Sequence, residues 1–154
     1  MTRPSRGFTL LELLVALALV GVLVAIAVPR VSAIIPGALL DQAARSLATD
    51  LRFARVKAIA ENRRRRLVVE LDRGAYRVEA DAEGTFVSEG APRTLPGGVT
   101  FDASASSRVS NGQISITFQP RGNTADNSTI ALAVAGRTGR RVIVSTAGRV
   151  RIDG

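Results

Sequence analysis

The sequence contains no cysteine and no histidine, and these two absences remove much of the chemistry that enzymes use. Without cysteine there is no disulfide framework, no thiolate nucleophile and no cysteine-ligated metal site. Without histidine, neither a Ser-His-Asp triad nor a histidine-ligated zinc site can form. We therefore expect no enzyme activity, no catalytic residues, and no bound metal or other cofactor.

Aromatic residues and lysine are also scarce. Tyr76 is the only tyrosine, tryptophan is absent, and Lys57 is the only lysine among 21 basic residues. The net charge of +8 is spread unevenly: residues 52–66 and 108–154 are strongly basic, whereas residues 67–107 contain more acidic than basic side chains. A basic–acidic–basic layout suits polyanion binding or charge-complementary packing of subunits. The arginine bias of a GC-rich genome explains the same excess equally well.

The longest apolar segment lies near the amino terminus. From Phe8 to Val28 there are 21 residues, and Glu12 is the only charged one among them. As a helix this run spans roughly 31 Å, close to the hydrocarbon thickness of a bilayer. The preceding residues, Met1–Gly7, carry Arg3 and Arg6 and no acidic residue. The pattern predicts a single transmembrane segment over residues 8–28.

A secretory signal peptide has the same basic head and apolar run, but it is followed by a small-x-small cleavage site. Here Val28-Pro29-Arg30 follows the run, and the small residue, Gly7, precedes it. We therefore expect the apolar segment to be retained in the mature protein as an anchor in the lipid bilayer.

Glu12 is the unusual residue of this segment. An ionisable side chain inside a membrane span costs about 2.5 kcal/mol or more at the centre, so it is a candidate functional residue. The alternative is that Thr9 and Glu12 form a capping box that begins the helix. Both interpretations stay open at this point.

The stretch GFTLLELLVALALVGVLVAIAVP resembles the amino-terminal signature of type IV pilins and type II secretion pseudopilins. The resemblance implies that a prepilin peptidase cuts between Gly7 and Phe8 and methylates the new amino group of Phe8. It implies that Glu12 pairs with the terminal amine of a neighbouring subunit during filament assembly. Pro29 falls where the family often has a helix-disrupting proline. The implied partners are other pilins or pseudopilins, the prepilin peptidase and an inner-membrane assembly platform.

Beyond the apolar segment the pattern predicts an amphipathic helix continuing over residues 29–62. Apolar residues recur at helical spacing at Leu40, Ala43, Ala44, Leu47, Leu51, Ala54, Ala58 and Ile59. We assign Asp41, Arg45, Asp50, Arg52 and Arg55 to the opposite, polar face. Pro29 and the Pro36-Gly37 pair can each kink or break the helix. The sequence therefore does not predict one straight, continuous helix. We expect the helix to end near Asn62 and the following arginines.

Beyond Arg66 the apolar period changes from about 3.6 to 2, which predicts strands. Leu67, Val69 and Leu71 alternate with polar neighbours, as do Tyr76 and Val78, and residues 72–75 suggest a hairpin turn. Later strands are expected at Thr85–Ser88, Val99–Asp102, Gln113–Gln119, Thr129–Ala135, Arg141–Ser145 and Arg149–Ile152. Residues 136–139 lack the ending of a phosphate-binding loop and are expected to form a turn. The fold class is therefore α+β: a long amino-terminal helix followed by a mainly antiparallel head, residues 63–154.

The stretches ITFQPRG, TIALAVAG and RRVIVSTAGRVRI resemble the globular domain of H-type minor pseudopilins and FimT-like minor pilins. This resemblance covers residues from about 41 to the end of the chain and implies a β-sandwich-like head behind a long helix.

Gly148-Arg149-Val150-Arg151 resembles the Gly-Arg-x-Arg element of DNA-binding FimT-like pilins. Alternation places both arginines on one face of a strand about 7 Å apart, a spacing that suits successive phosphates. The candidate DNA-binding residues are Arg137, Arg140, Arg141, Arg149 and Arg151. Exposed arginines on a strand are also commonly just solvated, and the scarcity of aromatics predicts weak sequence selectivity. The cluster Arg63–Arg66 is interpreted as the charged end of the helix, with an interaction patch as the alternative.

The sequence leads to two hypotheses for the function. The first is an H-type pseudopilin that helps to build or cap a type II secretion pseudopilus. The second is a FimT-like minor type IV pilin that binds DNA for uptake. Either protein would cross the inner membrane once, with its amino terminus cytoplasmic and its head periplasmic, before entering a periplasmic filament. A simple membrane-anchored periplasmic protein would not need the Gly7-Phe8 junction.

Overall fold

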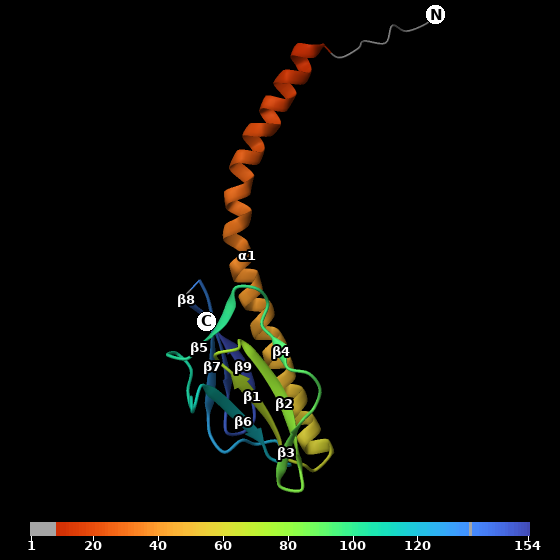
Figure 1. The fold of residues 1–154 in the computed structure, drawn as a ribbon, viewed down its shortest axis with the longest axis vertical. Helices are drawn as coiled ribbons and strands as arrows, with labels where there is room; N and C mark the ends of the chain where they lie inside the picture. Colours follow the sequence, from red (N-terminus) through yellow and green to blue (C-terminus); the bar gives the residue numbers. More distant parts are fainter. Residues whose placement is uncertain (1–8, 136) are drawn as a thin grey trace, which may run out of the picture. The chain divides into compact units, whose positions relative to one another are not determined.

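The structure is a computed structural model that describes residues 9–135 and 137–154, without the side chains of residues 27–35, 137 and 138. It divides into two units, Met1–Ile35 and Pro36–Gly154, of which the second contains the head (Figure 1). The predicted leader, residues 1–7, and the expected new amino terminus, Phe8, lie outside the described residues.

One helix, α1, begins at Leu10 and ends at Ala60. Its described side chains between Leu10 and Ile26 are all exposed in this single chain. Among the residues that the structure describes, no helical stretch is both long and apolar enough to cross a membrane. The segment predicted to cross a bilayer, residues 8–28, begins at a residue outside that described part.

The prolines do not end the helix. The backbone at Pro29, Pro36 and Gly37 is α-helical, so the local break that the sequence suggested is not present. A proline inside a helix removes one backbone hydrogen bond and crowds the preceding turn. The remaining bonds of the helix are sufficient to keep each proline within α1.

The end of α1 agrees with the prediction. Asn62 adopts a left-handed backbone, with φ of 50°. Its N–H donates to the Ile59 carbonyl at 3.3 Å, and the Arg63 N–H donates to the Ala58 carbonyl at 3.2 Å. These two bonds form a Schellman motif, which satisfies carbonyls that the last turn would otherwise leave unpaired.

The apolar face of α1 in the second unit is the predicted one, with one exception. Seven of the eight expected residues are buried, and Ala48 joins them, whereas Ile59 is exposed. Three residues assigned to the polar face are partly or fully buried, and Asp41 is one of the half-buried ones. Asp50 is only 8 % exposed, and Arg55 is half-buried. Asp50 lies three residues after Leu47 and four before Ala54, so it has the same helical spacing as the core residues.

The head contains two antiparallel sheets. In sheet A the strand order is β3-β2-β1-β6, and β4 pairs with β2 beyond this path. Its strands are β1 (Arg65–Glu70), β2 (Ala75–Ala82), β3 (Thr85–Ser88), β4 (Arg93–Thr94) and β6 (Gln113–Phe118). In sheet B the order is β5-β7-β8-β9. Its strands are β5 (Val99–Asp102), β7 (Ser128–Val134), β8 (Arg137–Val144) and β9 (Val150–Asp153). The predicted α+β class with a mainly antiparallel head is confirmed.

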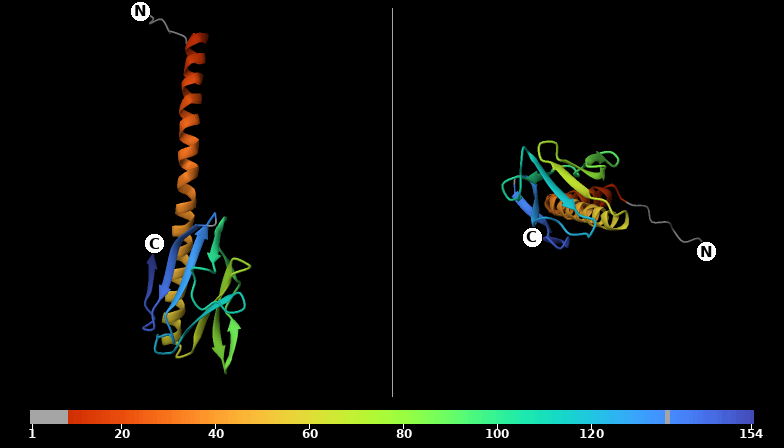
Figure 2. Two further views of the ribbon diagram at one scale, coloured as in Figure 1. Left: turned by 90° about the vertical axis from the view of Figure 1, so that its left-hand side faces the viewer. Right: turned by 90° about the horizontal axis from the view of Figure 1, so that it is seen from below.

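One core joins the helix and both sheets. Strands of both sheets run alongside α1 in the second unit (Figure 2). Sheet A contributes Leu67, Val69, Tyr76, Ile114, Ile116 and Phe118; sheet B contributes Val99, Phe101, Ile130, Leu132, Val142 and Val144. These residues alternate along their strands, as the period of two predicts. At about 25 cal/mol per Å² of apolar surface, this shared burial is the main stabilising contribution to the head.

Two details of the sheets differ from the sequence prediction, besides one-residue shifts at the ends of β6, β7, β8 and β9. Strand β4 was not predicted, because two residues carry no readable alternation. The predicted turn over residues 136–139 is shorter than expected, since β8 already begins at Arg137 and pairs with Val134. The ladder shifts register between Leu132 and Ala133, so Gly139 is an extra residue in β8, as in a β-bulge.

Candidate functional site

The first candidate region is the beginning of α1. Gly7 and Phe8, the predicted processing residues, lie outside the described residues, and the side chain of Pro29 is likewise not described. Glu12 is exposed, and its backbone N–H donates to the Thr9 hydroxyl at 3.2 Å. This bond is one half of a capping box. Within the described part of the chain the Glu12 carboxylate accepts no hydrogen bond, so its charge is available to a partner.

The second candidate region is the turn between β8 and β9, where the Gly-Arg-Val-Arg element lies. Arg55 on α1 donates from Nε to the Gly122 carbonyl at 2.8 Å and from an Nη to the Ala147 carbonyl at 3.2 Å. Arg52 donates to the Val150 carbonyl at 3.1 Å. Two helix arginines therefore hold the turn against α1. The sequence assigned both to a solvated face and so missed this role.

Gly148 fits this turn because it has no side chain. Its φ is +74°, and a Cβ placed there would lie 1.9 Å from the Gly122 carbonyl oxygen and 2.8 Å from Nε of Arg55. Both the left-handed backbone and the close approach favour glycine. The glycine of the element thus sets the turn from which Arg149 and Arg151 project.

Arg149 and Arg151 are exposed and border a hollow of about 670 Å³ on the outer face of sheet B. Thr129, Ile143 and Arg151 are register partners across β7, β8 and β9, so they form one row on this face. In the described part of the chain neither arginine forms an ion pair. The hollow is further lined by Asn127, Ser145 and Val150. The arrangement presents two guanidinium groups beside neutral hydrogen-bonding groups, which suits a phosphate or carboxylate ligand.

The other three arginines of the predicted DNA-binding set do not share one location. Arg141 is exposed on β8 opposite Asp153 of β9. Arg140 instead points to the helix, where its Nε lies 2.6 Å from an Asp41 carboxylate oxygen, and it also donates to the Gly154 carbonyl. The side chain of Arg137 lies outside the described residues. The outer face therefore combines Arg141, Arg149 and Arg151.

The basic cluster after the helix is largely neutralised within the head. Arg64 pairs with Asp81 at 2.7 Å, Arg66 pairs with Glu79 at 2.5 Å, and the buried Arg65 contacts Glu61 and Glu89. Burial opposes the charged form of Glu79, but hydrogen bonds from Arg66 and Arg77 outweigh it and hold the pKa of that carboxyl below its usual value. The helix-end interpretation is thus extended: these arginines also bind the acidic strands.

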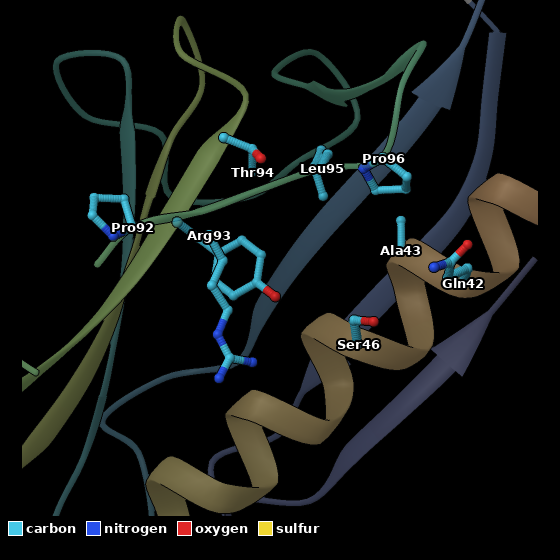
Figure 3. Close-up of a pocket in the computed structure, with 9 residues that line it drawn as sticks. Gln42, Ala43, Ser46, Pro92, Arg93, Thr94, Leu95 and Pro96 are labelled. Atoms are coloured by element: carbon cyan, nitrogen blue, oxygen red, sulfur yellow. The ribbon is translucent and has the colours of Figure 1, made fainter. Parts of the chain in front are cut away.

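A polar network that the sequence did not predict joins the buried Asp50 and Tyr76 to the exposed Arg93, and so connects α1, β2 and β4. The Asp50 carboxylate accepts from the Tyr76 hydroxyl at 2.7 Å and from Arg93 at 2.6 and 2.7 Å. Figure 3 shows Arg93 reaching toward α1, beside Thr94 and Leu95, across a hollow of about 500 Å³ lined by Gln42, Ala43 and Ser46 on the helix. The partners of Asp50 come from positions 26 and 43 residues away. The sequence signal that could have indicated the burial of Asp50 is its helical spacing relative to the core residues of α1.

The described residues contain no group of three or more acidic side chains arranged to hold a metal ion. The polar clusters are instead acid–base pairs, in which each carboxylate faces a guanidinium or a hydroxyl group. Such pairs position strands and loops, and they offer neither an activated nucleophile nor a general base of the kind that catalysis requires.

Two family models match the sequence. The model of "Type II transport protein GspH" matches residues 43–148, and the "Prokaryotic N-terminal methylation motif" matches residues 2–28. The pilin-like protein PilA1 of Thermus thermophilus is 37% identical over 168 residues, an alignment that covers 99% of this chain and 100% of PilA1.

Two solved structures share the fold. The type IV minor pilin FimU of Pseudomonas aeruginosa matches with a TM-score of 0.60 and 23% identity, covering 75% of this chain and 88% of that one. The minor pseudopilin EpsH from the Type 2 Secretion System of Vibrio cholerae matches with a TM-score of 0.59 and 12% identity, covering 74% and 94%. At these identities the likeness concerns the fold.

Proposed function

The chain belongs to the GspH family of type II transport proteins, within the type IV pilin and pseudopilin superfamily, and on this premise we propose that it is a minor pseudopilin of a type II secretion pseudopilus. A subunit of this superfamily is structural, and the chain is not an enzyme. The match of the GspH family model to residues 43–148, most of the head and the helix beneath it, is the observation that carries the secretion role.

In this role the first unit anchors the subunit before assembly. We place the leader at residues 1–7, the membrane and filament segment at residues 8–28, the helix continuation at residues 29–62 and the periplasmic head at residues 63–154. The methylation motif over residues 2–28 supports processing at Gly7-Phe8 by a prepilin peptidase. The exposed apolar side chains from Leu10 to Ile26 need lipid or neighbouring helices to cover them. An inner-membrane platform would then transfer the processed subunit into the filament.

An in-frame deletion of the gene tests the secretion role, with the intact gene restored as the control. The proposal expects exported proteins to accumulate in the periplasm of the deletion strain, while uptake of added DNA is unchanged. If secretion stays normal and DNA uptake is lost, the chain serves a type IV pilus and the secretion role is wrong.

Glu12 gives a prediction at the level of assembly. In an assembled filament its carboxylate would lie among apolar helices, where a charge is tolerated only with a cationic partner, such as the amino terminus of a neighbouring subunit. Glu12→Ala should still be inserted and cleaved but should be depleted from purified filaments. Thr9→Ala is the matched control, because it removes the capping hydroxyl and keeps the carboxylate. Depletion of Thr9→Ala to the same extent, or normal incorporation of Glu12→Ala, would leave capping as the role of Glu12.

A second candidate function is DNA binding by a FimT-like minor pilin. It is favoured by Arg149 and Arg151 beside the outer hollow of sheet B, which form no ion pair with any residue that the structure describes. If these arginines contact phosphates, the detergent-solubilised chain should bind duplex DNA with a Kd on the order of 10⁻⁶ to 10⁻⁴ M at physiological salt. Replacing both by alanine should weaken binding and lower the dependence of log K on log salt by about two units.

The control for this measurement is a double alanine variant of Arg45 and Arg63, which are exposed and form no ion pair in the described part of the chain. General basicity predicts that both double variants lose the same affinity. A loss confined to the Arg149 and Arg151 variant supports DNA binding at the outer face of sheet B. Absence of binding by the unmodified chain at low salt would overturn this second function.

A further inference from the structure

The last turns of α1 expose apolar side chains on the face turned away from the core. Phe53 is 56% exposed, Val56 is 60% exposed and Ile59 is 48% exposed. The opposite face of the same turns, with Ala54 and Ala58, is fully buried. A helix that is apolar on both faces is normally covered on both. This part of α1 therefore has one apolar face that the described residues leave uncovered.

The exposed residues follow the spacing at which two helices pack together. Phe53, Val56 and Ala60 are separated by three and four residues, as are successive a and d positions of a heptad. Thr49 occupies the preceding d position and is also exposed. We call Thr49, Phe53, Val56 and Ala60 the outer seam. Side chains with this spacing fit between those of a facing helix, so the expected partner of the outer seam is helical.

Basic side chains flank the outer seam. Arg45 and Arg52 occupy g positions and Lys57 an e position, where charges select the partner of a helix. None of the three forms an ion pair with a residue that the structure describes. Arg52 donates to the uncharged Val150 carbonyl, and Nζ of Lys57 lies 5.2 Å from the centre of the Phe53 ring. These three positive charges are therefore available to an acidic partner.

The acidic residues that border the outer seam are already engaged within the head. Asp50 accepts hydrogen bonds from Arg93, and Glu61 and Glu89 both contact the buried Arg65. They do not neutralise the flanking cations. The outer seam thus combines an apolar centre with a positively charged margin, which is complementary to an apolar surface with an acidic margin.

We propose that the outer seam binds an acidic amphipathic helix of a different protein. Apolar residues of that helix pack on Phe53 and Val56, and its carboxylates pair with the flanking cations. The apolar contact provides affinity, and the charges determine which helix is accepted. This interaction goes beyond the proposed secretion role, because it holds in either kind of filament.

A second copy of this chain does not supply such a helix. In the described part of the chain the one helix is α1, and between Leu10 and Ile26 its only charged residue is Glu12. Its later acidic residues, Asp41 and Asp50, are bound by arginines of the head. The charge pattern therefore favours a different protein over another copy of the same subunit.

Synthetic peptides of about three heptads test the proposal. All contain leucine and charged residues: one has leucine at a and d with glutamate at e and g, one has lysine in place of glutamate, and one is a scrambled form of the glutamate peptide. Fluorescence anisotropy measures their binding to the full-length chain in phosphatidylcholine nanodiscs, with empty nanodiscs as the blank. We expect only the glutamate peptide to bind. Equal binding of the lysine or the scrambled peptide would overturn the proposal.

Two matched variants locate the contact. Val56→Ser should weaken binding of the glutamate peptide by about five- to tenfold, since residues at the centre of an interface dominate its affinity. Val109→Ser is the control, because it makes the same exchange at an exposed valine between β5 and β6. The control should bind like the unmodified chain. The same loss in both variants would contradict a contact at the outer seam.

A charge exchange separates binding from folding. Arg45→Glu combined with Lys57→Glu keeps the apolar residues of the outer seam and leaves Arg52 to hold the Val150 carbonyl. This variant should keep the melting temperature of the unmodified chain and should bind the lysine peptide in preference to the glutamate peptide. An unchanged preference would contradict the proposal. Self-association of the unmodified chain that Val56→Ser abolishes would identify a second copy as the occupant and would also overturn it.

Discussion

At the scale of single residues, Tyr76 is the most informative side chain. Burial raises its pKa, and the hydrogen bond to the Asp50 carboxylate raises it further. An unfolded tyrosine titrates near pH 10. Above that pH the unfolded chain releases the tyrosine proton while the folded chain keeps it, so the free energy of unfolding should fall as the pH rises.

This prediction can be measured directly, because Tyr76 is the only tyrosine and there is no tryptophan. Ultraviolet absorbance of the tyrosinate should appear in the folded protein only at pH values well above the usual range. Chemical denaturation at increasing pH should show a decline in stability that Tyr76→Phe lacks. Normal titration of Tyr76 in the folded protein would contradict its burial against Asp50.

Sequence reasoning placed some of these residues and missed others. The alternation of Tyr76 with polar neighbours correctly indicated a strand, but its partner Asp50 was assigned to the wrong face of the helix. The error arose because a buried carboxylate is rare unless it is paired, and its partner Arg93 lies 43 residues away. The helical spacing of Asp50 contained the correct answer, which the polarity of its side chain obscured.

At the scale of elements, the β8–β9 turn depends on Gly148. Gly148→Ala should destabilise the head by about 1–3 kcal/mol, because it combines a left-handed backbone with a clash against the Gly122 carbonyl. Gly97→Ala is the control, since nothing lies within 4 Å of its Cβ position and its φ is not positive. Denaturant unfolding of the two variants provides the comparison. Equal effects would mean that Gly148 is not constrained by the turn.

Regular elements were predicted well, whereas irregular ones were not. The strands at Thr85–Ser88 and Val99–Asp102 have the predicted bounds, because period-two alternation between turn residues is a local signal. The two-residue β4 was missed. Its backbone pairs with β2, and its Arg93 binds Asp50, so it depends on contacts that are distant in the sequence. The helix continues through Pro29 and Pro36 because proline weakens a helix without always ending it.

At the scale of the whole chain, the uneven charge distribution has a structural explanation. Part of the basic segment 52–66 pairs with the acidic segment 67–107, through Arg64, Arg65 and Arg66. The carboxyl-terminal segment is less neutralised, and it leaves Arg141, Arg149 and Arg151 exposed on sheet B. The basic residues at the end of the helix are therefore used in packing within the head, whereas those on the outer face of sheet B remain exposed.

The amino-terminal signature and the α+β class could be predicted from the sequence, because both rest on local spacing. The order of strands in the two sheets was not predicted, since it depends on pairings between residues far apart in the chain. The same holds for the hollow beside Arg149 and Arg151, which requires β7, β8 and β9 to lie side by side.

The central claim is that this chain is a processed pilin-type subunit, and the mass of the mature protein tests it most directly. Intact-mass and amino-terminal peptide measurements on protein extracted from membranes should show the loss of residues 1–7 and one added methyl group on Phe8. A strain without its prepilin peptidase should contain only the uncleaved chain. A mature protein that begins after residue 28, or that keeps Met1–Gly7 in the presence of the peptidase, would contradict the account.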